Sequence, residues 1–336
     1  MKKLFYVLGM TALLTASAFR DAGAWLLYNN NFPAPLDAAA QSYLDSAIGR
    51  FQHQPKLAKG FANASVFSSH AATNRGYQGY DKVAITVGTM AAAQVPATTT
   101  DLSYYKKIGE RLQKEGDLYA GVAWNAWSLS VGFKIPLTDL YLTGKFGKLK
   151  YTYDDYKIDG MHAGGMLNYQ IIKQKSPPVK FVLWRGLSVG TGFLYQYNNT
   201  AFNYKVTPVS LYGGIVSVKP MLGINARTKS YVIPLEISTS IQLLWVLNIH
   251  VGGGIDFAWG SSDLRYSAIG MVTAPVPPFV GLFGAYGRQK GKGSSTYMPK
   301  IFCGPGIGFG PVFVDIPFTY YFMGGFNVGI TLGVVF

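Results

Sequence analysis

Apolar and polar residues alternate strictly along residues 312–336. From Asn327 onward one face of this pattern carries Val328, Ile330, Leu332, Val334 and Phe336, and the other carries Asn, Gly and Thr. The run from Val312 to Phe322 alternates in the same way, and Met323-Gly324-Gly325 between the two runs predicts a tight turn. A period of two indicates strands with one apolar and one polar face, here a terminal hairpin.

The same alternation recurs in most segments of the second half of the chain. The clearest pair is 231–245 and 247–260, where Ile, Leu, Val, Phe and Trp oppose Glu236, Ser238, Ser240, His250 and Asp256. Residues 140–153 also alternate, with an expected register shift near Gly147. An apolar face and a wet face in every strand predict a barrel with lipid outside and water or a polar plug inside. Tryptophans at strand ends fit the interfacial belts of such barrels.

Composition supports a membrane protein. Only 14% of residues are charged, against about 25% in typical soluble domains, and the chain has 40 Gly, 23 Tyr and 21 Phe. Past residue 19 no stretch of about 20 apolar residues predicts a spanning helix. We therefore predict an all-β fold, a transmembrane antiparallel β-barrel of about 12–14 strands, even in number, with an N-terminal plug-like segment containing a short helix. A large soluble β-sandwich or barrel is the alternative.

Three regions follow from the pattern. Residues 1–24 combine Lys2-Lys3, an apolar run and small residues at a cleavage site, which predicts a secretory signal peptide and export. Residues 25–81 contain a helical spacing from Leu36 to Ile48 and then a small, polar run without periodicity. This region is interpreted as a plug in the lumen, with a partly disordered extension as the alternative. Residues 82–336 form the barrel, with a short helix over 101–116 that lies on the membrane or in solvent.

The formal charge of +14 suits a membrane surface or an anion-selective lumen. Nucleic-acid binding is disfavoured, because the lysines are dispersed and the protein is exported. Charged residues on the predicted wet face are candidates for lining the pore, unless they pair with each other or with the plug. They are Lys134, Lys145, Lys148, Lys150, Lys219, Glu236, His250, Asp256 and Asp315.

The sequence offers little for catalysis or cofactors. Gly291-Lys292-Gly293 lacks the Ser or Thr that a phosphate-binding loop places after its Lys. The glycines at 304, 306, 308 and 310 fall on one strand face, which excludes a dinucleotide fingerprint. The four histidines are scattered, so we expect no metal site, no cofactor and no enzyme activity, with an outer-membrane enzyme as a minor alternative. The single cysteine, Cys303, excludes an intramolecular disulfide and is interpreted as a small buried residue.

The signal peptide, the strand series and the terminal NVGITLGVVF resemble bacterial outer-membrane β-barrel proteins. In that family a terminal aromatic strand is recognised by the assembly machinery, which implies this role for Phe336 together with Val334. Asn31-Phe32-Pro33-Ala34 is similar to a motif in the hatch of long-chain fatty-acid transporter barrels. The resemblance implies a hatch at 25–81, fourteen strands, outer-membrane lipid as a partner, and passage of small or hydrophobic solutes. The alternative is a non-transporting surface-exposed barrel, an adhesin or structural protein.

Overall fold

The computed structural model describes residues 25–29, 55–73, 83–95, 121–174, 181–205, 209–211, 216–274, 279–291 and 293–336. The predicted signal peptide and the predicted helices near 36–48 and 101–116 lie outside these ranges. Among the described residues the chain forms one helix and fourteen strands joined in a single sheet.

The elements follow one another in an order dominated by long strands. They are β1 Trp25–Asn29, α3 Pro55–Ser68, β2 Val83–Gln94, β3 Gly121–Lys134, β4 Leu140–Tyr153, β5 Tyr156–Ile172, β6 Val182–Lys205, β7 Val209–Leu211, β8 Val216–Leu243, β9 Leu247–Ala274, β10 Phe279–Lys290, β11 Tyr297–Phe309, β12 Val312–Asp315, β13 Phe318–Tyr321 and β14 Gly325–Val335. All the described strand pairs are antiparallel.

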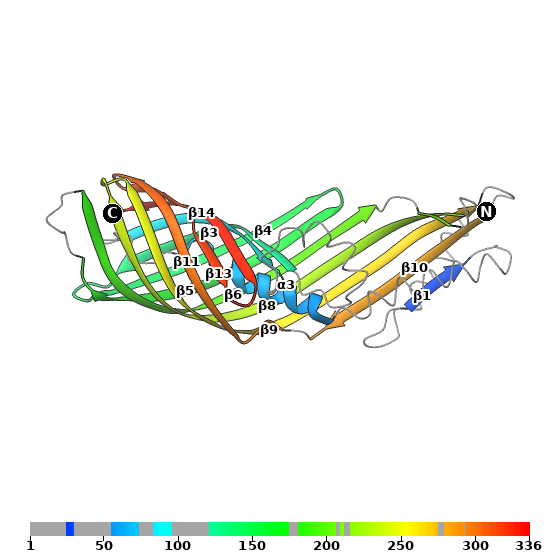
Figure 1. The fold of residues 1–336 in the computed structure, drawn as a ribbon, viewed down its shortest axis with the longest axis horizontal. Helices are drawn as coiled ribbons and strands as arrows, with labels where there is room; N and C mark the ends of the chain where they lie inside the picture. The colour runs from blue at the N-terminus through cyan, green and yellow to red at the C-terminus, as the bar shows by residue number, and fades with distance from the viewer. Residues whose placement is uncertain are drawn as a thin grey trace.

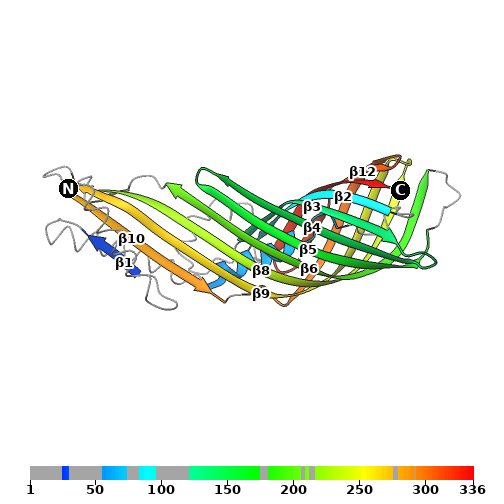
Figure 2. The same ribbon diagram turned by 180° about the vertical axis from the view of Figure 1, so that it is seen from behind.

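The last strand closes the sheet into a ring. β14 pairs with β2 from Gly325 opposite Gln94 to Val335 opposite Ala84. Beyond that register, Val83 and Phe336 exchange backbone hydrogen bonds of 3.1 and 2.8 Å. Figures 1 and 2 show the red C-terminal strand beside the cyan β2 in both views. The predicted antiparallel β-barrel is confirmed, and its ring closes between the terminal strand and Val83–Gln94.

One position in the ring is filled by two shorter strands. β12 and β13 both pair with β11 and β14, and the break between them falls at Pro317, which has no N–H to donate to the ladder. β10 lies outside the ring, because it pairs with the part of β9 beyond β11 and, on its other side, with β1. The predicted turn at 323–325 is present, with Gly324 at φ 83°. The fourteen strands of the described sheet fall within the predicted number.

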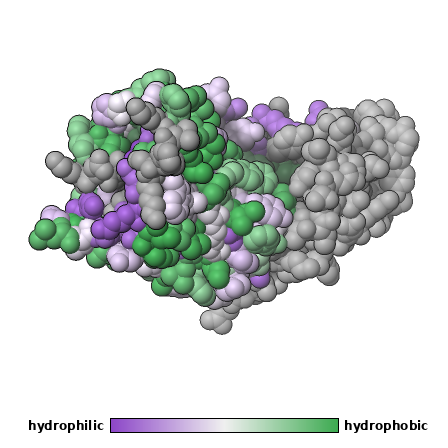
Figure 3. All heavy atoms as spheres, turned by 60° about the vertical axis from the view of Figure 1, so that its left-hand side comes forward, coloured by the Kyte–Doolittle hydropathy of each residue, from purple (hydrophilic) through white to green (hydrophobic). Residues whose placement is uncertain are grey.

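The two faces of the wall differ as the alternation predicts. β14 alternates buried and exposed residues, and its exposed set is Phe326, Val328, Ile330 and Leu332. The other strands of the ring expose Ile, Leu, Val, Phe and Trp in the same way, and Figure 3 shows these apolar residues in green over the outside of the barrel. Cys303 belongs to this outer face, so the prediction that it is buried is wrong: in β11 the even-numbered residues point inward.

Within the described part of the chain, no helix is both long enough and apolar enough to cross a membrane.

One side of the barrel continues far beyond the ring. β8 and β9 each have 28 residues. About ten residues suffice for a tilted strand to cross a bilayer, so this sheet projects well past it. Figure 1 shows β8, β9 and β10 extending to the right of the short strands β13 and β14. β1 pairs with β10 on this extension, which places Trp25–Asn29 outside the lumen.

The helix α3 lies in the lumen of the ring. Its sequence PKLAKGFANASVFS begins with Pro55, which suits the first helical position, and contains small residues on every side. We predicted no helix here because no apolar stripe repeats at helical spacing. The structure explains this difference: from Gly60 to Ala72 every residue is buried, so no face needs to be polar for solvent.

Candidate functional site: a buried ionic cluster between the lumen helix and the barrel wall

The lumen segment, residues 55–73, is α3 and the turn that follows it. It contacts β2, β3, β6, β8, β9, β10 and β14, and therefore touches most of the wall. Two approaches are so close that only glycine fits. A Cβ on Gly121 of β3 would meet the backbone at Gly60 and Phe61, and one on Gly325 of β14 would meet the ring of Phe67. The wall is thus shaped to receive this helix.

Polar side chains tie the lumen segment to the wall at several heights. Asn63 donates to Gln94 Oε1 at 3.0 Å and accepts from the backbone N–H of Ser295 at 2.8 Å. Asn198 donates to Ser65 Oγ at 3.0 Å. These residues are buried, and burying a polar group is costly unless it is hydrogen-bonded. The ties therefore fix the position of the helix along the barrel axis.

A group of charged residues meets at the turn after α3. We call the side chains of His70, Glu236, Asp256, Lys300 and Tyr321 the ionic cluster. Lys300 Nζ lies 2.5 Å from Glu236 Oε1, 2.5 Å from Asp256 Oδ1 and 3.1 Å from His70 Nε2. The second oxygen of Asp256 lies 2.9 Å from His70 Nε2 and accepts a 3.0 Å hydrogen bond from the Tyr321 hydroxyl. One carboxylate thus joins the lumen segment to three strands of the wall.

All five residues are buried. The side chains of His70, Asp256 and Lys300 are 0% exposed and that of Glu236 is 4% exposed. Charges in so dry a place are strongly coupled, because little water screens them. Tyr321 adds an apolar link, since its ring stacks on Phe67 of α3 with centroids 3.9 Å apart. Replacing any member of the cluster should therefore weaken the contacts that hold the lumen segment against the wall.

Three members of the cluster have the donor types of a metal site. Ligand atoms of His70, Glu236 and Asp256 lie within 4.8 Å of one another, although the histidines are scattered in sequence. Imidazole and carboxylate donors suit several divalent ions. Here the Lys300 ammonium lies among these same atoms and supplies the cation. The residues present therefore fit a salt bridge, and would take a metal ion only after Lys300 moved away.

Lys145 of β4 makes a second attachment to the same turn. Its ammonium donates to the carbonyl oxygens of Ser69 at 2.5 Å and Ala71 at 3.2 Å, and to Thr73 Oγ1 at 2.8 Å. A lysine beyond the last turn of a helix satisfies exposed carbonyls and is favoured by the helix dipole. Lys145 therefore holds the C-terminal end of the lumen segment.

The structure places six of the nine predicted lumen residues on the inner face. Glu236 and Asp256 come together in the ionic cluster, and Lys145 lies against the helix end. His250 and Asp315 are buried above Gly304 and Gly306, whose missing side chains leave room for them. Lys134 is half-buried at the end of β3. The six predicted residues on the inner face are therefore Lys134, Lys145, Glu236, His250, Asp256 and Asp315.

Lys148, Lys150 and Lys219 are exposed on the outer face, so their prediction as lumen residues is wrong. For β4 we expected a register shift near Gly147, but the β4–β5 ladder runs without interruption from Leu140 to Tyr153. Lys148 and Lys150 therefore share the face of Phe146, opposite to Lys145. Likewise β8 pairs with β9 without interruption from Ser217 to Leu243, which keeps Lys219 on the face opposite to Glu236.

Sequence reasoning missed three members of the cluster. Lys300 shares its strand face with Met298 and Phe302, a pattern that marks it as inward once residues 297–309 are recognised as a strand. Tyr321 lies on the polar face of the alternating run from Val312 to Phe322. His70 carries no signal at all, because nothing in its surroundings predicts which residues of the wall it meets.

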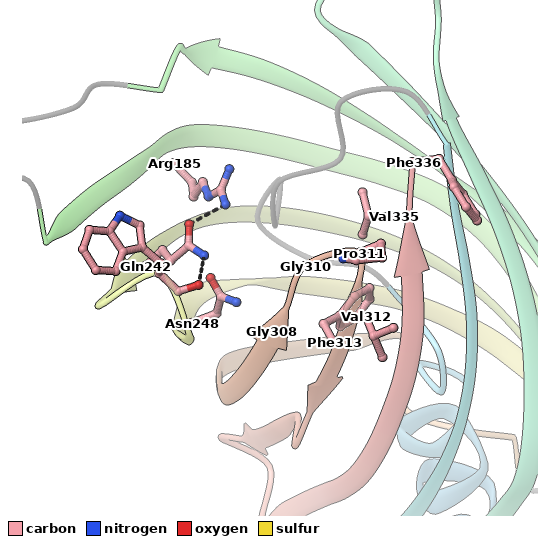
Figure 4. Close-up of a pocket in the computed structure, with 11 residues that line it drawn as sticks. Arg185, Gln242, Asn248, Gly308, Gly310, Pro311, Val312, Phe313, Val335 and Phe336 are labelled. Atoms are coloured by element: carbon pink, nitrogen blue, oxygen red, sulfur yellow. Dashed lines mark hydrogen bonds between the residues drawn. The ribbon is translucent and has the colours of Figure 1, made fainter.

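A cavity of about 330 Å³ opens at the C-terminal mouth of the barrel, between the β8–β9 turn and the ends of β11 and β14. Figure 4 shows Arg185 and Gln242 on one side of it and Val335 and Phe313 on the other. Arg185 donates to Gln242 Oε1 at 2.6 Å, and Gln242 donates to the carbonyl of Trp245 at 2.8 Å. The mouth thus combines a guanidinium held in place with an apolar wall.

A closed antiparallel ring with an apolar outer face and a polar, helix-filled interior defines an outer-membrane type of β-barrel. The chain belongs to the Lsa36-like family, whose family model matches residues 23–336. A search of curated proteins finds no match.

Similar solved structures include channels and transporters. They are the CymD monoaromatic hydrocarbon channel (10% identity, 82% of this chain and 98% of that chain, TM-score 0.29), the Ralstonia pickettii toluene transporter TbuX (8%, 83% and 99%, 0.26) and a Pseudomonas aeruginosa FadL homologue (7%, 82% and 98%, 0.26). The closed ring with its apolar outer face, and not these similarities, confirms the expected β-barrel of the outer-membrane type. At these scores the likeness carries no argument about substrate.

Proposed function

We propose that the protein is an outer-membrane barrel that passes small or hydrophobic solutes, with the lumen segment as its gate. The observation that carries this proposal is that α3 fills the lumen of the ring and is tied to the wall by side-chain hydrogen bonds as well as by apolar contacts. Polar ties exchange with water at modest net cost, about 1 kcal/mol for a typical hydrogen bond. Opening the gate would break these ties and separate the apolar contacts of Phe61 and Phe67 from the wall, so we expect the closed state to predominate until a solute or partner displaces the helix.

The charged residues of the inner face give the proposed path its chemistry. Lys134, Lys145, His250 and Asp315 lie on it, as do the two carboxylates of the ionic cluster. In this proposal the cavity at the C-terminal mouth is a vestibule, and its volume is in the range of small-ligand pockets. Arg185 would attract an anionic head group there while Val335 and Phe313 contact an apolar tail.

The same proposal includes the membrane location of the barrel and its route of assembly. The mature chain would sit in outer-membrane lipid after removal of residues 1–24, with residues 25–81 as an N-terminal segment and 82–336 as the barrel. Phe336 and Val334 would present the terminal strand to the assembly machinery. Deletion of Phe336 should lower the yield of heat-modifiable, membrane-integrated protein in cells. Unchanged membrane insertion of the variant would contradict a role of Phe336 in assembly.

A reversible tether tests the gate directly. In a Cys303→Ser background, Ser65→Cys with Asn198→Cys would join α3 to β6, where the native side chains hydrogen-bond at 3.0 Å. We expect little conductance or solute flux in the oxidised protein, and a rise when a reductant opens the disulfide, whose formation is verified by mass spectrometry. The matched control is Cys303→Ser alone, which should not respond to reductant.

Equal flux in the oxidised and reduced states would contradict gating by the lumen segment. Absence of conductance and of solute uptake, both in the full chain and after deletion of residues 55–73, would contradict transport itself.

The second candidate function is that of a non-transporting, surface-exposed barrel. The length of β8 and β9 favours it, because 28-residue strands carry a folded sheet well beyond the bilayer. This candidate predicts that shortening the extension abolishes binding to a surface ligand while the ring still folds. A barrel without conductance in any variant would support it over the transporter.

A further inference from the structure

A row of aromatic rings crosses the outer face of the barrel on neighbouring strands. Tyr195, Tyr231 and Trp259 lie opposite one another on β6, β8 and β9. Ring centroids are 5.3 Å apart between the two tyrosines and 6.1 Å apart between Tyr231 and Trp259, and Phe193 packs against both Tyr231 and Trp259. Tyr and Trp gather at the boundary between hydrocarbon and head groups, so this row marks a membrane interface.

The distance from this row to the other end of the apolar face fits a bilayer. On β8 the outward residues from Leu243 to Tyr231 are apolar or Thr, and on β9 those from Leu247 to Trp259 are apolar or Gly. Each stretch covers twelve residue steps (positions 231–243 and 247–259), or about 40 Å along the strand. At a tilt near 45° this corresponds to about 28 Å of membrane thickness, close to the hydrocarbon core.

Basic residues begin on the same outer face where the apolar stretch ends. On β8 the next outward positions after Tyr231 are Lys229 and Arg227, and on β9 those after Trp259 are Ser261, Asp263 and Arg265, with Asp263 opposite Arg227. On β4 Lys148 and Lys150 follow Phe146, and Arg288 of β10 lies opposite Arg265. All six basic residues are exposed. We call this set the basic collar: Lys148, Lys150, Arg227, Lys229, Arg265 and Arg288.

The acidic residues on this face leave most of the positive charge uncompensated. Asp263 accepts two hydrogen bonds from Arg288, at 2.8 and 2.7 Å, and one from Arg265 at 3.4 Å, so that one carboxylate orients two guanidinium groups. Asp159 lies opposite Lys150 in the ladder. Among the described residues no carboxylate forms an ion pair with Lys148, Lys150, Arg227 or Lys229. The collar is therefore a net cationic surface directly beyond the interface row.

We propose that the basic collar binds the anionic phosphate head groups of the leaflet in which the barrel sits. The apolar face and aromatic row place the head groups at this height, and the basic side chains carry the complementary charge. Arg in particular donates two hydrogen bonds to a phosphate in a fixed geometry. Head groups bound along β4, β8, β9 and β10 would then hold the barrel at a defined depth, with the extension of β8, β9 and β10 beyond them.

The test compares lipid selectivity of the full chain refolded into vesicles of phosphatidylcholine mixed with phosphatidylglycerol. Native mass spectrometry counts the lipids of each type retained by the released protein. We expect retention of phosphatidylglycerol over phosphatidylcholine, reduced about tenfold in the Arg227→Gln/Lys229→Gln variant and weakened by salt. The control variant Lys134→Gln/Lys173→Gln removes the same charge elsewhere and should keep the selectivity. Heat-modifiable electrophoretic mobility verifies that each variant is folded.

Three results would overturn the proposal. The first is equal selectivity in the wild type, the collar variant and the control. The second is competition by inorganic phosphate at constant ionic strength, which would make the collar a site for the free ion. The third is collar-dependent binding of heparin by protein in phosphatidylcholine vesicles without phosphatidylglycerol selectivity, which would assign the surface to an acidic polysaccharide. None of these results depends on whether the barrel transports a solute.

Discussion

The ammonium of Lys300 lies 2.5 Å from the carboxylate of Asp256, and both side chains are 0% exposed. The two residues are on neighbouring strands, β11 and β9, and His70 of the lumen segment reaches both of them. The attachment of the helix to the wall is thus built on an ion pair within the wall. This makes the pair the most sensitive point of that attachment.

Lys300→Met should destabilise the barrel and loosen the lumen segment. It leaves Glu236 and Asp256 buried without their cation, which costs about 3–5 kcal/mol in comparable pairs. Chemical unfolding in detergent would measure the loss. The variant Lys173→Met breaks the exposed pair with Asp139 and should cost less than about 1 kcal/mol. A similar small cost for both variants would show that the buried pair does not hold the fold.

Replacing all three charges should recover much of that loss. Lys300→Met combined with Glu236→Gln and Asp256→Asn removes the unpaired carboxylates while keeping their shape, so stability should return toward that of the wild type. The same unfolding measurement applies. A triple variant less stable than Lys300→Met alone would show that the carboxylates stabilise the barrel through other partners.

Removing the lysine side chain should create a metal site. In Lys300→Ala the ligand atoms of His70, Glu236 and Asp256 lose the cation among them and could accept Zn²⁺. We expect Zn²⁺ to raise the thermal midpoint of Lys300→Ala and not that of the wild type. The double variant His70→Asn/Lys300→Ala is the control, and its stabilisation by Zn²⁺ to the same extent would exclude this site.

Lys145→Met should release the end of the lumen segment. It removes three hydrogen bonds from a charged donor, each worth about 1.5–3 kcal/mol where its loss leaves a buried group unsatisfied. Hydrogen exchange of residues 65–73 should become faster while exchange in β8 and β9 stays slow. Lys148→Met, on the same strand and the opposite face, is the control and should leave exchange in 65–73 unchanged.

Gly121→Val should displace α3 from the wall. Its side chain would meet the backbone of Gly60 and Phe61, which cannot rotate away, and overpacking of this kind costs about 1–3 kcal/mol. Gly144→Val is the control because nothing lies within 4 Å of its added Cβ. Limited proteolysis of the lumen segment would compare the two. Equal resistance in both variants would place the helix away from β3.

Much of the wall follows from local sequence. Alternation from Val328 to Leu332 identified an outward apolar face without knowledge of any partner, because side chains of a strand point to opposite sides. The assignment of faces failed where we assumed a register shift that the strand does not have, as at Gly147. A one-residue error there moved Lys148 and Lys150 to the wrong side of the wall.

By itself the sequence determined a β-barrel with an apolar outer face and polar residues inside, because the period-two pattern is a property of each strand alone. Only the tertiary structure decided that residues 55–68 are a helix in the lumen. This segment has no apolar stripe, and its small residues suit a helix only because the barrel wall buries it on every side. It also decided the ionic cluster. Pairing of β8, β9, β11 and β13 brings Glu236, Asp256, Lys300 and Tyr321 together, and insertion of the lumen segment adds His70.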